Sequence, residues 1–220
     1  ANTETVQAAR GEILDRYGRV LVSNRAGYQV TLDTKLMGNV QGRNDTVLEL
    51  LEICREQGVA WSDTLPVSGR VPFGYTESRP FENVTTDDSG VETTSPSQLR
   101  RLADILKLKM PADPSAKELV AALRTYFEVD EAVGEEEGRA LVGVLYELAL
   151  RSKDVARTGY VFAQDVDIQF ITAVKERGLA GVKIETVTVR QYETASAAHL
   201  LGQVGPIYAE EWDQYKDKGY

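Results

Sequence analysis

The two ends of the chain show the alternation of apolar and polar positions that is typical of β-strands. Residues 28–33 alternate strictly, which predicts a strand whose inward side chains are Tyr28, Val30 and Leu32. Residues 182–192 also alternate, but the phase changes between Ile184 and Val187. Because side chains repeat every two residues along a strand, the apolar positions on either side of this change cannot share one face. We therefore expect a bulge or a change of partner near Glu185–Thr186.

A tight turn is predicted close to the N-terminus. Asp15 and Gly18 occupy its first and last positions, where aspartate accepts a backbone hydrogen bond and glycine tolerates a positive φ. Apolar runs at 12–14 and 20–22 flank the turn and predict a pair of strands.

The middle of the chain has apolar residues every three or four positions, which predicts helices. We expect them at 45–57, from Ser95 as N-cap, from Asp113-Pro114, and after the acidic stretch 130–138. Their predicted buried stripes are Val47, Leu50, Leu51 and Cys54; Leu99, Leu102, Ala103 and Leu106; Leu119, Ala122, Leu123 and Tyr126; and Leu141, Val144, Leu145 and Leu148.

Other segments complete the prediction. Residues 59–94 are rich in Gly, Pro, Ser, Thr and Asp, which indicates a long irregular segment with room for a short hairpin. Residues 165–177 predict a helix with Phe170, Ile171 and Val174 inward. Short helices are also expected at 195–201 and 209–220.

Strands at both ends and helices between them predict an α+β fold. The simplest arrangement is a β-rich lobe built from both chain ends with an inserted helical lobe. The expected boundaries are 1–40 for the first half of the β-rich lobe, 41–155 for the helical lobe and 156–220 for the second half.

Negative charge is concentrated in the expected helical lobe. Residues 41–155 carry 13 Lys and Arg against 21 Asp and Glu, a net charge of −8, out of −9 for the chain. Such a surface repels phosphate backbones and anionic lipids, so nucleic acid is excluded as a partner. The acidity serves either solubility or the docking of a basic partner on this lobe.

The sequence contains no recognisable motif of a catalytic centre. No serine has a lysine three residues further on, and neither Lys-Thr-Gly nor Gly-x-Ser-x-Gly occurs. The single histidine, His199, lies among alanines and leucines and is better explained as a packed residue than as a ligand or base. Cys54, the single cysteine, falls on an apolar stripe. Acidic pairs such as Asp87-Asp88 and Glu135–Glu137 fit a solvated surface, and we expect no metal or cofactor.

Two segments resemble signatures of the N-terminal, non-catalytic domain of class B penicillin-binding proteins. The first resembles R-G-x-I-x-D-R-N-G-x-x-L-A-x-N, and the matching residues are Arg10, Gly11, Ile13, Asp15, Arg16, Gly18, Leu21 and Asn24. The second resembles R-x-Y-P followed by A-A-H-x-L-G-x-V-G, and its matches are Arg190, Tyr192, Ala197, Ala198, His199, Leu201, Gly202, Val204 and Gly205. Three positions depart from the signatures, namely Tyr17 for Asn, Val22 for Ala and Glu193 for Pro.

The resemblance implies a pedestal, also called a dimerisation domain, of a peptidoglycan transpeptidase. It implies a place on the extracytoplasmic face of a bacterial membrane, with an anchoring helix and a C-terminal transpeptidase domain that this sequence does not include. The implied partners are that transpeptidase domain, SEDS-family glycosyltransferases, other elongation or division proteins, and a second copy in a homodimer. Within the first signature, Arg10, Asp15 and Arg16 would form a charge network; alternatively, they satisfy the turn backbone and the surface.

Two further functions stay open beside this one. The first is a stand-alone extracellular binding module that shares the fold but has no catalytic partner. The second is a carboxylate hydrolase, which would need two acids at a fixed separation in a cleft.

Overall fold

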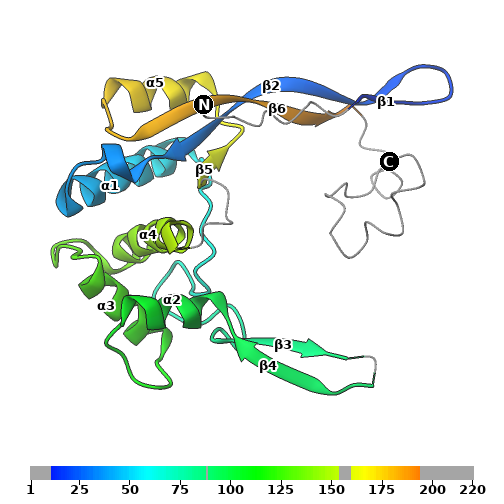
Figure 1. Ribbon diagram of the computed structural model, residues 1–220. Helices are drawn as coiled ribbons and strands as arrows, with labels where there is room; N and C mark the ends of the chain where they lie inside the picture. The colour runs from blue at the N-terminus through cyan, green and yellow to red at the C-terminus, as the bar shows by residue number, and fades with distance from the viewer. Residues whose placement is uncertain (1–10, 88, 154–159, 194–220) are drawn as a thin grey trace, which may run out of the picture. The chain divides into compact units, whose positions relative to one another are not determined.

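The computed structural model describes residues 11–87, 89–153 and 160–193, and Figure 1 shows their arrangement. The elements in chain order are β1 (Ile13–Leu14), β2 (Val20–Leu32), η1 (Thr34–Leu36), α1 (Val40–Gln57), β3 (Glu82–Thr86), β4 (Glu92–Pro96), α2 (Gln98–Leu106), α3 (Ala116–Tyr126), α4 (Glu135–Lys153), β5 (Val161–Gln164), α5 (Ile168–Glu176) and β6 (Val182–Tyr192).

The chain divides into two compact units. The larger comprises residues 27–187, and the described part of the smaller comprises 11–26 and 188–193. Within both units together, no described helix is long and apolar enough to cross a membrane.

Strand β2 is the centre of an antiparallel sheet. It pairs with β1 through Ile13 and Val22, and with β5 through Val30 and Ala163. Strand β6 runs antiparallel along it, because Glu193 N donates to Leu21 O (3.0 Å) while Asp33 N donates to Gly181 O (2.8 Å). The predicted α+β fold is confirmed, with strands from both chain ends paired in one sheet.

The strands differ from the prediction in two respects, namely the continuity of β2 and the direction of one side chain. The expected strands at 20–22 and 28–33 are one strand rather than two, and it ends at Leu32. Tyr28 was expected to face inward but is 37% exposed, whereas Val30 is fully buried. In β6, Glu185 and Thr186 are consecutive exposed residues, so the exposure pattern changes phase where expected, while the bulge or change of partner stays a prediction.

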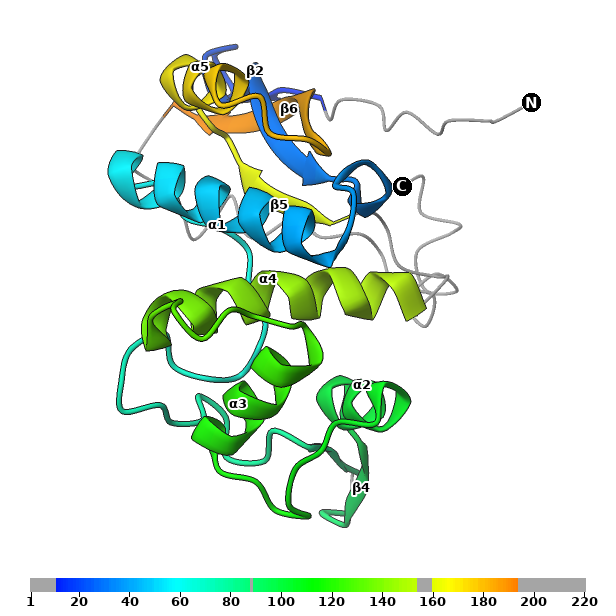
Figure 2. The same cartoon turned by 90° about the vertical axis from the view of Figure 1, so that its left-hand side faces the viewer.

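The helices are stacked within the larger unit. Figure 2 shows α1 between the sheet strands and α4, with α2 and α3 beyond α4. Helix α1 starts earlier than predicted because Asn39 caps it by accepting a hydrogen bond from Gly42 N. It ends at Gly58, which has a φ of 66°.

Two helix starts were predicted wrongly by two residues. Ser97, not Ser95, caps α2, because Pro96 still belongs to β4. Ser115, not Asp113, caps α3: its hydroxyl binds Glu118 N while the Glu118 carboxylate accepts from Ser115 N. This reciprocal capping box satisfies two backbone donors that Asp113-Pro114 would leave open.

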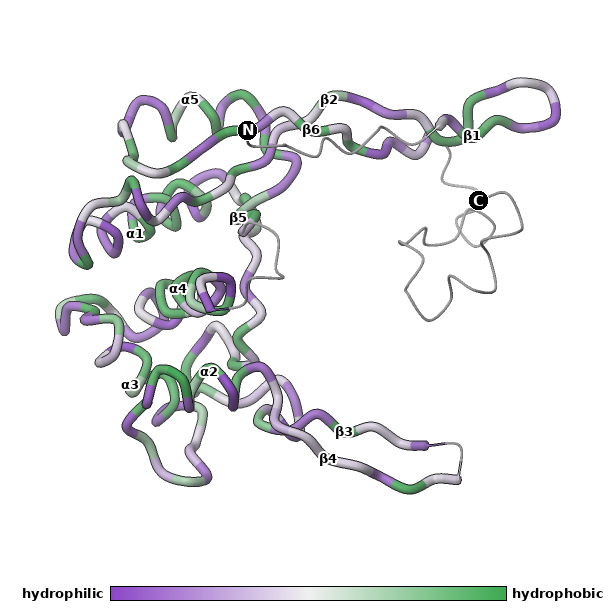
Figure 3. Tube along the Cα trace, in the orientation of Figure 1, coloured by the Kyte–Doolittle hydropathy of each residue, from purple (hydrophilic) through white to green (hydrophobic). Residues whose placement is uncertain are grey.

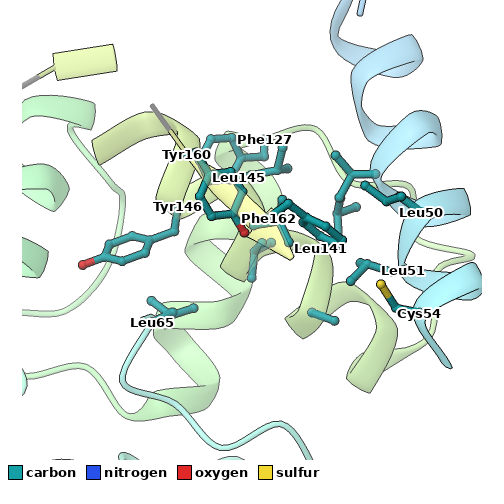
Figure 4. Packing of buried hydrophobic residues seen from close by; sticks show 14 of the residues in the cluster. Leu50, Leu51, Cys54, Leu65, Phe127, Leu141, Leu145, Tyr146, Tyr160 and Phe162 are labelled. Carbon is teal, nitrogen blue, oxygen red and sulfur yellow. The ribbon is translucent and has the colours of Figure 1, made fainter. Parts of the chain in front are cut away.

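The hydrophobic core contains residues of all five helices and of the sheet, and Figure 4 shows a part of it from close by. Leu50, Leu51 and Cys54 of α1 are buried as predicted. All four residues of the α2 stripe are buried too. Tyr126 of the predicted α3 stripe is 44% exposed, whereas Val120, which was not in that stripe, is buried. Helix α4 is buried on more than one face, including the charged Arg139 and Glu147. It is therefore a central helix rather than a surface helix with one apolar stripe.

The hairpin allowed for in the irregular segment is confirmed, since β3 and β4 pair from Glu82–Pro96 to Thr86–Glu92. Helix α5 was expected from residue 165 but starts after Asp167, whose side chain accepts from Phe170 N. It buries Phe170, Ile171 and Val174 as predicted. The helices expected at 195–201 and 209–220 lie outside the described residues.

Candidate functional site

The signature turn is held by Asp15. Its Oδ1 accepts from Tyr17 N (2.8 Å) and Arg19 N (2.9 Å), and its Oδ2 accepts from Arg19 Nε (2.7 Å). Gly18 closes the turn by donating to Asp15 O and has a φ of 78°. The backbone N–H of Arg19 is the largest influence that lowers the pKa of Asp15, so the carboxylate stays ionised and keeps these bonds near neutral pH.

Arg16 does not join a buried network. It is exposed, and its guanidinium lies 4.7 Å from the centroid of the Tyr17 ring, which is itself 69% exposed. These contacts of Asp15 and Arg16 agree with the alternative in which the two residues satisfy the turn and the surface, while a network that includes Arg10 stays a prediction. Arg10 lies outside the described residues.

Arg190 connects the two signatures. Its Nη1 donates to Gly11 O (2.6 Å) and to Asn24 Oδ1 (3.1 Å). Three signature residues that are far apart in the sequence are therefore in contact. A guanidinium suits this position because Nη1 carries two N–H donors and can therefore bind both acceptors at once.

Glu193 adds a contact that the sequence did not predict. Its N–H binds Leu21 O, and its Oε1 accepts from Ser23 Oγ (2.7 Å). Proline, the usual residue of the resembled signature at this place, has no N–H and could not make the first bond. Tyr192 is 56% exposed, while His199, Gly202 and Gly205 lie outside the described residues.

A second polar cluster lies inside the larger unit. Arg139 Nη1 contacts Asp63 Oδ2 at 2.6 Å, and the same guanidinium donates to Leu65 O and Val67 O. Glu147 accepts from Thr64 and pairs with Arg151. Together these contacts fasten the segment after α1 to α4.

The close packing of the segment after α1 against α4 depends on Gly143. A Cβ at Gly143 would collide with the carboxylate of Asp63. Burial is the main influence on Asp63 and raises its pKa, although the charge of Arg139 acts in the opposite direction. Because the ion pair is internal and its bonds are used by the protein itself, we assign it a role in stability rather than in chemistry.

The remaining acidic pairs have structural partners. Glu136 accepts from Val71 N, Glu137 contacts Arg55, and Asp87 binds the backbone of its own turn. Across the described ranges, no three His, Cys, Asp or Glu side chains form a group that could hold a metal ion. An open groove of about 450 Å³ lies between α5 and β6, and its lining includes Tyr28, Ile168 and Lys175.

Comparison with known proteins identifies the family. The model of the penicillin-binding protein dimerisation domain matches residues 5–220. The chain belongs to this family. The dimerisation domain is a non-catalytic part of a penicillin-binding protein, and the resemblance found in the sequence is confirmed.

This chain is also similar to two solved structures. Penicillin-binding protein 2B from Streptococcus pneumoniae strain 5204 is 16% identical, with a TM-score of 0.40, and the match covers 99% of this chain and 32% of that one. The same protein from strain R6 is 21% identical, with a TM-score of 0.33, and the match covers 96% and 30%. The chain thus spans about a third of the length of these proteins. Comparison with curated proteins gives no match.

Proposed function

We propose that this dimerisation domain is the non-catalytic scaffold of a class B penicillin-binding protein in peptidoglycan synthesis. It positions a C-terminal transpeptidase domain and contacts cell-wall synthesis partners. The observation that carries the proposal is the family match over residues 5–220 in a sequence without Ser-x-x-Lys or Lys-Thr-Gly. The nucleophile and its base would therefore belong to another part of the protein.

The proposal includes a place and a set of partners. We expect the domain on the extracytoplasmic face of a bacterial membrane, anchored by a transmembrane helix of the whole protein. The expected partners are the transpeptidase domain, a SEDS-family glycosyltransferase, other elongation or division proteins, and a second copy of the protein. The acidity of residues 41–155 favours a basic partner for that part of the chain.

The proposal also assigns roles to parts of the domain. Residues 1–40 and 156–220 would form the pedestal lobe, and 41–155 an inserted lobe that carries partner contacts. The bonds of Arg190 to Gly11 and Asn24 support a structural role for the signature residues, since they join both ends of the pedestal. The same role is proposed for Arg10, His199, Gly202 and Gly205.

Penicillin labelling of the native protein tests the function. An antibody against the chain would capture the protein from membranes, which is then treated with fluorescent penicillin. We expect a labelled band much larger than this chain, and no label after excess unlabelled penicillin. The chain itself should show no penicillin adduct by intact-mass spectrometry. An unlabelled band at the size of the chain would instead favour the alternative, a stand-alone extracellular binding module.

A further inference from the structure

The β3–β4 hairpin buries none of its strand residues. All ten positions, Glu82–Thr86 and Glu92–Pro96, are exposed. Figure 1 shows the hairpin extending away from α2, and Figure 3 colours it mostly white and purple. An isolated two-stranded hairpin is marginally stable in water and normally gains stability from packing or from additional strands. Here neither face of the hairpin packs against the hydrophobic core.

The hydrogen bonds at its two ends fix the direction of its backbone groups. Asp87 N donates to Val91 O (3.1 Å), and Ser97 N donates to Phe81 O (3.0 Å). Because hydrogen-bonded and non-hydrogen-bonded pairs alternate in an antiparallel ladder, Val84–Thr94 is a non-hydrogen-bonded pair. The N–H and C=O groups of Val84 and Thr86 therefore point away from β4. Among the described residues no partner is found for them.

The two outer edges of the hairpin are not equivalent. On β4 the outward residues are Glu92, Thr94 and Pro96, and the proline has no N–H to offer. On β3 the N–H of Glu82 is used by Arg79 O, which leaves Val84 and Thr86 open. Threonine and valine also favour extended backbone. The β3 edge is thus the better template for another strand.

Charge selects the occupant of this edge. Residues 77–96 contain five acidic side chains and one basic side chain, Arg79. Glu82 and Glu92 share Arg79 and lie on the same face of the hairpin as Val84. The hydroxyl of Ser89 is the main influence that lowers the pKa of Asp87, which keeps the tip negative. A second copy of this acidic hairpin would be repelled, and so would an anionic glycan, whereas a basic strand would be attracted.

We propose that the β3 edge binds an extended segment of a partner protein as a third antiparallel or parallel strand, with Lys or Arg at alternate positions on the face of the sheet that carries Glu82 and Glu92. The hydrogen bonds of Val84 and Thr86 would provide the pairing, and the acidic face would select the sequence. The identification of this partner as a cell-wall synthesis protein rests on the proposed function, but the strand addition does not.

The test uses the whole chain and a fluorescein-labelled peptide of alternating Lys and Val residues, followed by fluorescence anisotropy. A second peptide with Glu in place of Lys reports on charge. Val84→Pro removes the outward N–H of β3, and Thr94→Pro removes the facing outward N–H of β4. These two variants form a matched pair because neither N–H belongs to the ladder.

We expect Val84→Pro to weaken binding of the basic peptide at least about tenfold, while Thr94→Pro leaves it within about twofold. Glu82→Gln should weaken binding several-fold, and 0.5 M salt should do the same, because the Debye length then falls well below about 8 Å. The Glu-containing peptide should not bind. Amide hydrogen exchange should slow at Val84 and Thr86 when the basic peptide is present.

Three results would overturn the proposal: equal effects of the two proline variants, binding of both peptides alike, or binding of soluble peptidoglycan fragments in place of the basic peptide. Sedimentation of the chain alone gives a fourth, namely a dimer that Val84→Pro abolishes. None of these results depends on penicillin labelling, so failure of the strand addition and failure of the scaffold function are distinguishable.

Discussion

Cys54 shows how burial controls the chemistry of a single residue. It is 1% exposed on α1, and burial raises the pKa of its thiol to about 12. Only the thiolate reacts with disulfide reagents, and at pH 8 roughly one such thiol in 10⁴ is ionised. The raised pKa also favours the folded state below the usual thiol pKa of about 8.5, and this contribution is lost as the pH rises towards 12.

We therefore expect Cys54 to react at least about 100-fold more slowly with Ellman's reagent in the folded protein than in urea, at pH 8. Because the sequence has one cysteine, the absorbance reports this site alone. Raising the pH from 7 to 9 should speed the reaction in urea about 25-fold, because a thiol with a pKa near 8.5 is then mostly ionised, and in buffer about 100-fold, because a thiol with a pKa of about 12 is still mostly protonated. Equal rates in buffer and urea would contradict the burial of this face of α1.

Arg139 offers a second test at the scale of one side chain. Its side chain is 5% exposed and binds Asp63 and two carbonyl oxygens. Arg139→Met leaves Asp63 buried without its cation and should lower the free energy of unfolding by about 3–5 kcal/mol. Arg55→Met is the control, because the Arg55–Glu137 pair is about 40% exposed on each side and should cost under about 1 kcal/mol. Urea unfolding measures both variants, and similar losses would contradict a special role for the internal pair.

At the scale of the elements, much of the fold could be predicted from periodicity alone. The α2 stripe was correct because its apolar residues repeat on one face and its polar residues cover the other. The burial of helix α4 was underestimated, because charged residues such as Arg139 and Glu147 are expected at the surface from the sequence alone. Their burial depends on partners in the segment that follows α1, and such long-range contacts leave no local pattern. The bonds of Arg190 to Gly11 and Asn24 were missed for the same reason.

Helix starts were predicted less well, because two capping signals compete within a few residues. In residues 113–118, Asp113-Pro114 matches one signal and Ser115 with Glu118 matches another. The second satisfies two backbone donors, which explains why it determines the start. Ser115→Ala should therefore destabilise the protein by about 1 kcal/mol, whereas Asp113→Ala should cost less than about 0.5 kcal/mol. Thermal unfolding measures the stability lost by each variant. A larger loss for Asp113→Ala than for Ser115→Ala would indicate that the helix starts at Asp113.

At the scale of the whole molecule, the hydrophobic core belongs to one of the two units. Every residue of the main buried cluster lies between Val30 and Val174, inside the unit of residues 27–187. In the described part of the other unit, the single buried apolar side chain is Val22. Since burial of apolar surface is the main source of folding stability, the two units should differ greatly in their ability to fold alone.

We expect a chain of residues 27–187 to fold by itself. It keeps the capped helices, the ion pair of Arg139 and all of the main core, so its unfolding should stay cooperative, with a midpoint within about 5–10 °C of the intact chain. Slow reaction of Cys54 in this shortened chain would show that its core is intact. A chain that unfolds without a heat-absorption peak, or that exposes Cys54, would mean that the outer halves of β2 and β6 are needed to hold the sheet against α1 and α5. The domain would then be stable only when both of its ends are joined, and the contacts of Arg190 would contribute to its folding.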